Sequence, residues 1–263
     1  MPVNDASWSW PELAAVVLSR ELRDGEVGSP GGSRSEIPLA AARLAQLTHA
    51  PNLAIITSAA GFVANMVGKP WSPLFSSTMD WRNVYAGTEA VLPSSGVFHT
   101  RRDWFFAGAL QVDAYGNINL SAIRMKDGTE MRGPGAAGLA YSSTMARRYF
   151  IYMHEHSRRS FVPQLDYRTA IGFGDGPGSR ERLGLRGGGP ALVISPRGVM
   201  DFDEATRRLR LRSVHPGHSV EELVENTGCA LMVPAAVPET TAPSQRELDV
   251  LRHQVDVGGV LRR

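Results

Sequence analysis

A short, uninterrupted apolar run directly after an amphipathic helix is the feature that most restricts the fold. Residues 37–50, IPLAAARLAQLTHA, have the apolar spacing of a helix, and residues 53–57 follow as a continuous apolar stretch with paired isoleucines. Such a stretch is typical of a strand that is covered on both faces, as strands of a parallel sheet are. A helix followed by a buried strand therefore predicts an α/β fold.

Further segments have the character of buried strands, because each is short, apolar and flanked by glycine, proline or polar residues. They lie at residues 104–110, 149–153 and 191–195, and residues 199–202 with 209–214 form an expected hairpin. We therefore expect an open, mostly parallel sheet flanked by helices. In such sheets ligands bind at the carboxyl ends of the strands.

Three Ser-x-x-Glu capping boxes mark the expected starts of helices. They begin at Ser9, Ser219 and Ser244. The first predicts a helix that continues past Leu22 until Gly25 ends it, the second a short helix that stops at Gly228, and the third a helix appended at the C-terminus. No internal repeat or long linker divides the sequence, so we expect a single domain over residues 1–263 with a C-terminal extension from about residue 236.

The composition excludes several classes of function. Of 263 residues, 43% are hydrophobic and 21% charged, the formal net charge is +2, and no run of five like charges occurs, so we expect no nucleic-acid partner. The apolar runs are too short to span a bilayer, and the first ten residues do not resemble a targeting segment. The single cysteine, Cys229, excludes an internal disulfide and suits a reducing cytosol. We therefore expect a cytoplasmic protein without membrane contacts.

Two motifs have both a chemical and a structural interpretation. The alternating glycines of residues 171–178 resemble a phosphate-binding loop, but Pro177 interrupts them and an arginine-rich stretch follows, so we expect a surface loop. His154, Glu155 and His156 offer metal ligands, but no further ligand is identifiable. Hydrogen-bonded histidines are the expected alternative, and no metal site is predicted.

A glycine-rich turn is a better candidate for a site. Residues 132–138, RGPGAAG, place backbone amides without shielding side chains just before an expected helix start. The amides of Gly133, Gly135 and Ala136 are suited to stabilising an oxyanion. A tight turn that permits close backbone packing fits the same composition equally well.

The segment GALQVDAYGNINLSA, residues 108–122, joins a strand to a turn that carries amide side chains. Gln111, Asn117 and Asn119 are candidates for shaping a pocket. Taken alone, Asn119 would be an ordinary loop amide that bonds neighbouring backbone.

Together these segments resemble the B (beta) subunits of class I coenzyme A transferases, and among them the glutaconate type most. The similarity is collinear over nearly the whole chain, and the string Q-V-D-x-Y-G-N-x-N is specific. The matching segments are THAPNLAII (48–56), GALQVDAYGNIN (108–119), GPGAAG (133–138), MHEHSRRSFV (153–162), DGPGSRERLGL (175–185), VHPGHSVEELVENTG (214–228) and ELDVLRHQVD (247–256). The resemblance implies the transferase α/β fold, with coenzyme A as part of the substrate and no tightly bound cofactor.

The resemblance also gives residue 58 a meaning. In transferring members of the family, the strand after Ala-Pro-Asn ends in a glutamate that attacks the acyl-CoA and forms an acyl anhydride and then a glutamyl-CoA thioester. The corresponding position here is Ser58, and residues 52–79 contain no Asp or Glu. A serine hydroxyl without a base is a poor nucleophile. Other branches of the family use the same fold for decarboxylation, or for hydrolytic ring opening with an acid from the partner subunit.

Three hypotheses follow from the resemblance. The first is a beta subunit of an acyl-CoA enzyme that acts on a dicarboxylic or oxo-acyl thioester by decarboxylation or hydrolysis, with Ser58 at the former nucleophile position. The second is a genuine CoA-transferase whose nucleophile comes from its partner. The third is a catalytically inactive structural subunit. In each, the implied partner is a homologous A (alpha) subunit in an α2β2 heterotetramer.

Overall fold

The computed structural model describes residues 8–31, 36–57, 62–64, 102–136 and 138–263. These residues form two compact units, one comprising the chain up to Phe106 together with Thr241–Arg263, and the other Ala107–Thr240. The prediction of a single domain over residues 1–263 stays a prediction.

The first unit contains a sheet whose central strands are parallel. Its strands are β1 (Val27–Ser29), β2 (Ala54–Thr57), β3 (Phe62–Ala64) and β4 (Trp104–Gly108), which continues into the second unit. β1 pairs in parallel with both β2 and β4, and β3 runs antiparallel to β2. Gly28 pairs with Trp104, and a Cβ at Gly28 would lie 2.2 Å from the Trp104 ring, so only glycine fits there.

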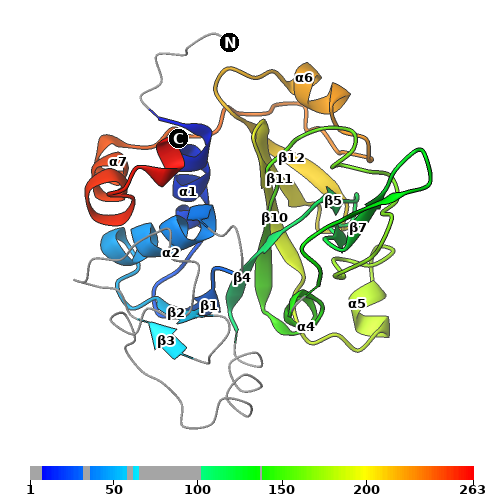
Figure 1. Cartoon of the computed structure of the whole chain (residues 1–263), viewed down its shortest axis with the longest axis horizontal. Coiled ribbons are helices and arrows are strands. Elements are labelled where there is room, and N and C mark those ends of the chain that lie inside the picture. The colour runs from blue at the N-terminus through cyan, green and yellow to red at the C-terminus, as the bar shows by residue number, and fades with distance from the viewer. Residues whose placement is uncertain (1–7, 32–35, 58–61, 65–101, 137) are drawn as a thin grey trace. The chain divides into compact units, whose positions relative to one another are not determined.

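Helices pack together in the same unit, as Figure 1 shows in blue and red. They are α1 (Trp10–Arg20), α2 (Glu36–Thr48) and α7 (Gln245–Val250), and α7 continues into a π-helical turn, Leu251–Val255, that precedes a short 3-10 turn, Val260–Arg262. The apolar positions of α1 and α2 are almost fully buried, which explains the spacing seen in the sequence. The predicted C-terminal helix is confirmed.

Salt bridges attach this C-terminal segment to α1. Arg252 donates from Nε and Nη2 to the carboxylate of Glu12 over 2.7 and 2.9 Å, and Glu12 is only 1% exposed. Burial alone would raise the pKa of Glu12, but the bonds from Arg252 and from the Ser9 backbone outweigh it and lower that pKa. Arg20 forms a second, more exposed pair with Glu247. The charged contacts therefore connect residues from opposite ends of the sequence.

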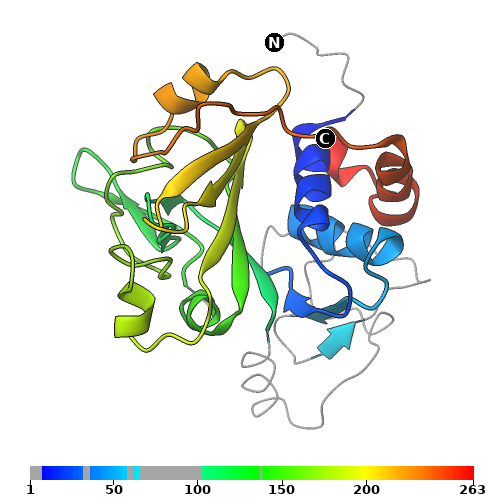
Figure 2. The same cartoon turned by 180° about the vertical axis from the view of Figure 1, so that it is seen from behind.

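The second unit contains a mixed sheet and two small hairpins (Figure 2). In the sheet, β9 (Arg148–Tyr152) is parallel to β10 (Pro190–Ser195), and β11 (Gly198–Phe202) and β12 (Leu209–Val214) continue it antiparallel. The hairpins are β5 (Gln111–Val112) with β6 (Ile118–Asn119), and β7 (Ala122–Arg124) with β8 (Glu130–Arg132). The helices are α4 (Leu139–Met145), α5 (Ser179–Arg182) and α6 (Val220–Glu225).

The expected fold class, an open and mostly parallel α/β sheet flanked by helices, is confirmed. The Ser9 and Ser244 capping boxes are both present, and the Ser219 hydroxyl caps α6. One boundary differs, since α1 ends at Arg20 and does not continue to Gly25, because the chain turns there, with Gly25 at φ +75°, before entering β1. No helix in the described ranges is long and apolar enough to cross a bilayer.

Candidate functional site

The β5–β6 hairpin carries the three amide side chains that the sequence singles out, and all three are buried. Its turn is closed by Asp113, whose Oδ1 accepts hydrogen bonds from the backbone N–H groups of Tyr115 and Asn117 over 2.9 and 3.0 Å. Gly116 follows with φ +67°, a conformation that favours glycine. The Asp and the Gly of the motif Asp-x-Tyr-Gly-Asn are therefore explained by the geometry of this turn.

Asn117 uses its side chain inside the protein. Its Nδ2 donates to Asp113 Oδ2 and to the carbonyl of Gly174, both over 2.8 Å, and its Oδ1 accepts from the N–H of Gly172 over 2.9 Å. These bonds fasten the loop at residues 171–178 to the hairpin. The structure thus shows Asn117 as a support for that loop, and the predicted role in shaping a substrate pocket stays a prediction.

Gln111 and Asn119 contact each other across the hairpin. Asn119 Nδ2 donates to Gln111 Oε1 over 2.8 Å and to the carbonyl of Ala122 over 2.7 Å. Gln111 in turn exchanges two bonds with Asp166, because its Nε2 donates to Asp166 Oδ2 over 2.9 Å and its Oε1 accepts from the Asp166 N–H over 3.1 Å. The two amides predicted for one pocket therefore lie together, and Asp166 joins them.

The glycine-rich turn lies directly after β8. The N–H of Gly133 donates to the carbonyl of Ser121 over 2.8 Å, and the N–H of Gly135 donates to the carbonyl of Leu120 over 3.0 Å. Within the described part of the chain, the amide of Ala136 has no such acceptor. Of the three amides predicted to stabilise an oxyanion, two are thus engaged by backbone carbonyls, and that of Ala136 has no acceptor among the residues that the structure describes.

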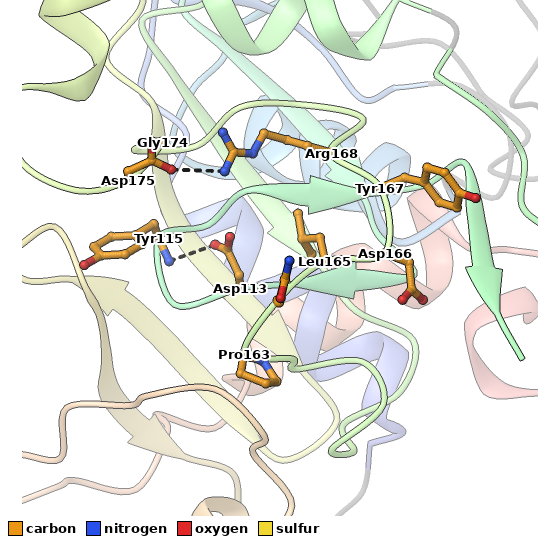
Figure 3. A pocket seen from close by; sticks show the side chains of 10 residues that line it. Asp113, Tyr115, Pro163, Leu165, Asp166, Tyr167, Arg168, Gly174 and Asp175 are labelled. Atoms are coloured by element: carbon orange, nitrogen blue, oxygen red, sulfur yellow. Dashed lines mark hydrogen bonds and ion pairs between the residues drawn. The ribbon is translucent and has the colours of Figure 1, made fainter. Parts of the chain in front are cut away.

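A cavity of about 330 Å³ opens beside the hairpin. Figure 3 shows its lining, with Arg168 paired to Asp175 over 3.1 Å and the Tyr115 N–H bonded to Asp113. The lining side chains come from the hairpin turn and from two following loops: Asp113, Tyr115, Pro163, Gln164, Leu165, Asp166, Tyr167, Arg168, Gly174 and Asp175. Residues 163–168 carry little signal in the sequence, because only the fold brings this loop against the hairpin.

The charges of this cavity do not suit an anionic ligand. Asp113, Asp166 and Asp175 face a single guanidinium of the lining, that of Arg168, which Asp175 already binds. Burial raises the pKa of Asp113, although bonds from Asn117 and the backbone act in the opposite direction. A dicarboxylic acyl group or the phosphates of coenzyme A would meet net negative charge here. This cavity is therefore a poor candidate for an acyl-CoA site.

Two buried histidines lie in hydrogen-bond networks. His156 bonds Ser195 Oγ through Nδ1 over 2.6 Å and Thr227 Oγ1 through Nε2 over 3.0 Å. His215 bonds Thr240 Oγ1 and the carbonyl of Ser195. Burial lowers the pKa of His156 to about 3 and that of His215 to about 4, so both rings are neutral at physiological pH. For His156 the structure shows the hydrogen-bonded alternative, and the described residues contain no cluster suited to a metal ion.

The arginine that follows the glycine loop is also structural. Arg180 is 5% exposed and donates to the carbonyls of Gly172, Gly187 and Ser143 over 2.8 to 3.0 Å. With its donors directed at backbone oxygens, it does not offer a phosphate site. Residues 171–178 form a loop held by Arg180 and Asn117, but it is only partly at the surface, because residues 172–174 and Gly176 are buried while Asp175, Pro177 and Gly178 are exposed.

Ser58, the position assigned to the former nucleophile, lies outside the described residues. β2 is described up to Thr57, which immediately precedes it. The predicted place of Ser58 at the end of a strand, and its surroundings, stay predictions.

Comparison with known proteins identifies relatives over nearly the whole chain. A sequence model of the family described as coenzyme A transferase matches residues 12–226. The B subunit of glutaconate CoA-transferase from Acidaminococcus fermentans is 33% identical, over 94% of this chain and 92% of its own. The crystal structure of that organism's enzyme superposes with a TM-score of 0.82 and 29% identity over 99% of both chains.

Two further relatives carry names of other activities. The cholesterol ring-cleaving hydrolase IpdB subunit of Mycobacterium tuberculosis is 28% identical over 93% of this chain and 94% of its own. A crystal structure of the decarboxylase AibA/AibB superposes with a TM-score of 0.77 and 26% identity over 97% of both chains. The same chain architecture therefore occurs in a transferase, a hydrolase and a decarboxylase.

Proposed function

Because the chain belongs to the coenzyme A transferase family, we propose that it is the beta subunit of a two-subunit enzyme that acts on an acyl-CoA thioester by decarboxylation or hydrolysis. The acyl group of the proposed substrate is dicarboxylic or oxo-acyl. The observation that carries the proposal is the absence of any Asp or Glu from residues 52–79, the stretch that includes the end of β2 and Ser58.

The missing carboxylate changes the chemistry that is possible. Transfer requires a carboxylate of the enzyme that attacks the acyl-CoA, forms a mixed anhydride and releases the CoA thiolate. The thiolate then attacks the enzyme's carbonyl of the anhydride, which forms a thioester on the enzyme and releases the free acid. A serine ester would not exchange its acyl group with free acids in this way. In a decarboxylation, by contrast, a neutral residue at position 58 avoids repulsion of the substrate carboxylate. The carbon–carbon bond breaks, carbon dioxide leaves, and the electron pair moves onto the thioester oxygen.

The amide of Ala136 is the donor that we assign to that oxygen. It is the one amide of the predicted three without a backbone acceptor in the described chain. A fixed N–H group aimed at a developing oxyanion stabilises an enolate and a tetrahedral intermediate alike, so one turn serves either decarboxylation or hydrolysis. In this proposal Gly133 and Gly135 hold the turn, and Gln111 and Asn119 support it from the hairpin.

The proposed partner is a homologous A (alpha) subunit in an α2β2 assembly. The names of the relatives support a two-subunit enzyme, since they include a B subunit, an IpdB subunit and the pair AibA/AibB. Coenzyme A enters only as part of the substrate, and we propose no tightly bound cofactor. The single, buried Cys229 suits a reducing, cytoplasmic setting.

Product analysis of the assembled complex tests the proposal. The tagged chain is purified with its partner and incubated with a panel of dicarboxyl- and oxo-acyl-CoA thioesters in the presence of isotopically labelled acetate, and the products are identified by mass. Loss of carbon dioxide, or addition of water with no label in any thioester, is expected. Labelled acetyl-CoA as the main product would contradict the proposal.

Genuine CoA transfer is the second candidate, favoured by the similarity to the glutaconate CoA-transferase of Acidaminococcus fermentans. In that case the nucleophile comes from the partner subunit. The test substitutes the acidic residues of the partner subunit one at a time and repeats the labelled-acetate assay. If the partner supplies the nucleophile, one of these substitutions abolishes CoA transfer, and no covalent intermediate forms on this chain.

A further inference from the structure

Two consecutive backbone carbonyls hold the glycine turn through hydrogen bonds. Leu120 and Ser121 accept the N–H groups of Gly135 and Gly133, respectively. Gly133 also packs tightly there, since a Cβ on it would lie 2.5 Å from the Leu120 carbonyl oxygen. A displacement of residues 120–121 is therefore transmitted directly to the turn and to Ala136, which follows it.

The backbone N–H groups of the same two residues donate to side-chain oxygens. The N–H of Leu120 donates to Thr169 Oγ1 over 2.9 Å, and the N–H of Ser121 donates to Asn119 Oδ1 over 2.9 Å. Thr169 Oγ1 lies a further 2.7 Å from Ser121 Oγ. The Thr169 hydroxyl thus contacts both residues that carry the turn.

Thr169 is itself fixed in place by the backbone. Its N–H and that of Ala170 both donate to the carbonyl of Ile118, and Ile118 donates back to Ala170. Thr169 is 8% exposed, so its hydroxyl has little access to water. An anchor of this kind has a defined position before any substrate binds, which is the requirement for a preorganised donor.

We propose that Thr169 is a positioning residue that fixes the Gly133–Ala136 turn through Leu120 and Ser121. The proposal rests on the function proposed above, in which the amide of Ala136 faces the thioester oxygen. The hydroxyl makes no contact with substrate. It stabilises residues 120–121, whose carbonyls accept the two glycine N–H groups. The hydrogen bonds that link Thr169 to the turn form a connected series, and each polarises and strengthens the next.

Kinetics of the assembled complex test this role. Thr169→Val removes the hydroxyl at nearly constant volume. We expect it to lower kcat about tenfold, which is less than the loss of an oxyanion donor costs, and to change KM less than about twofold. Thr169→Ser, which keeps the hydroxyl, is expected to restore kcat to within about threefold. Thr240→Val is the matched control, because Thr240 is similarly buried but bonds Ser213 and His215.

Amide hydrogen exchange gives a readout that does not depend on activity. In Thr169→Val, the N–H groups of Leu120, Gly133 and Gly135 are expected to exchange faster, while in Thr240→Val they keep their protection. If wild-type complex turns over no thioester, the proposed function fails and the exchange data still decide whether Thr169 holds the turn. If Thr169→Val does not assemble, Thr169→Ala takes its place in both measurements.

Four results would overturn the positioning role. Three of them are an unchanged kcat in Thr169→Val, a loss of kcat in Thr169→Ser as large as in Thr169→Val, and unchanged amide exchange at the glycine turn. An equal loss of kcat in Thr240→Val would also overturn it, because the effect would then reflect general destabilisation.

Discussion

Asn119 Nδ2 and Gln111 Oε1 are joined by a 2.8 Å hydrogen bond in the buried interior of the β5–β6 hairpin. Asn119 also bonds the backbone of Ala122 and Ser121, so one side chain connects the hairpin, the start of β7 and the segment that carries the glycine turn. Removal of a buried amide with three such bonds lowers the free energy of unfolding, because its buried partners are left without a hydrogen bond and cannot reach water.

Asn119→Ala is expected to lower the free energy of unfolding by about 1 to 3 kcal/mol, since the Ala122 carbonyl and the Ser121 N–H lose the bonds that this side chain makes. Urea denaturation of the complex measures the loss. Asn226→Ala is the control, because the Asn226 side chain makes only a local bond, to the carbonyl of Glu222 in the helix that Asn226 ends. Equal midpoints for the two variants would contradict the importance of the hairpin network.

The Glu12–Arg252 pair is expected to secure the C-terminal segment. Arg252→Ala leaves a carboxylate that is 1% exposed without its guanidinium, a change that typically costs about 3 to 5 kcal/mol. Adding Glu12→Gln to Arg252→Ala removes the buried charge and should recover part of the loss. Arg210→Ala, which breaks a half-exposed pair with Asp201, should cost about 0.2 to 1 kcal/mol. A larger loss of thermal stability in Arg210→Ala than in Arg252→Ala would refute this account.

Stability should fall between pH 7 and pH 5 because of the buried histidines. The folded-state pKa values of His156 and His215, about 3 and about 4, lie below the ordinary value of 6.5. The unfolded chain therefore binds protons below pH 6.5 that the folded chain does not, and stability decreases as pH falls. Each histidine contributes up to about 1.4 kcal/mol per pH unit in this window.

The denaturation midpoint at pH 7 and at pH 5 measures this effect. The Glu247 carboxyl, with its pKa lowered to about 2, acts in the same direction only below its ordinary value of 4.5. The histidines can therefore be distinguished from it. His156→Gln should reduce the difference between the two midpoints, and an unchanged difference would show that His156 does not titrate as described.

Gly133→Ala is expected to displace the glycine turn. The added Cβ would lie 2.5 Å from the Leu120 carbonyl oxygen and from Leu110 Cδ1, so the backbone must shift. Turnover of the complex should fall at least about tenfold, by analogy with loss of an oxyanion donor. Gly138→Ala is the matched control, because no described atom lies within 4 Å of its Cβ and its φ of −86° suits alanine. Equal activities in the two variants would exclude a role for the turn's position.

The sequence predicts the parts of the fold that depend on neighbouring residues. The Ser9 and Ser244 capping boxes involve contacts three residues apart, and Leu53 and Ile55 of the apolar run before Ser58 are buried, as the composition of the run predicts. Such local patterns determine where elements begin and which face they bury. The antiparallel pairing of β3 with β2 required the structure, because residues 62–64 carry no distinctive strand signal.

The candidate site was less predictable because its contacts join distant residues. Gln111 was identified from a motif, but its partner Asp166 lies 55 residues away. The engagement of Gly133 by the Ser121 carbonyl likewise depends on the fold of two hairpins. Arg180 belongs to the arginine-rich stretch after the glycine loop, and only the structure shows that its guanidinium is directed at backbone carbonyls. Residue types indicate possible chemistry, and only the fold determines which donors are already used.

Hydride trapping of the assembled complex tests most directly whether this chain lacks a carboxylate nucleophile. The complex is incubated with an acyl-CoA substrate, treated with borohydride, which reduces an enzyme thioester to an alcohol, and digested for peptide mass analysis. A Ser58→Glu variant serves as the positive control. We predict no CoA-dependent reduction at any residue of the wild-type chain. Reduction of one of its own glutamates, together with exchange of CoA between acids, would contradict the account.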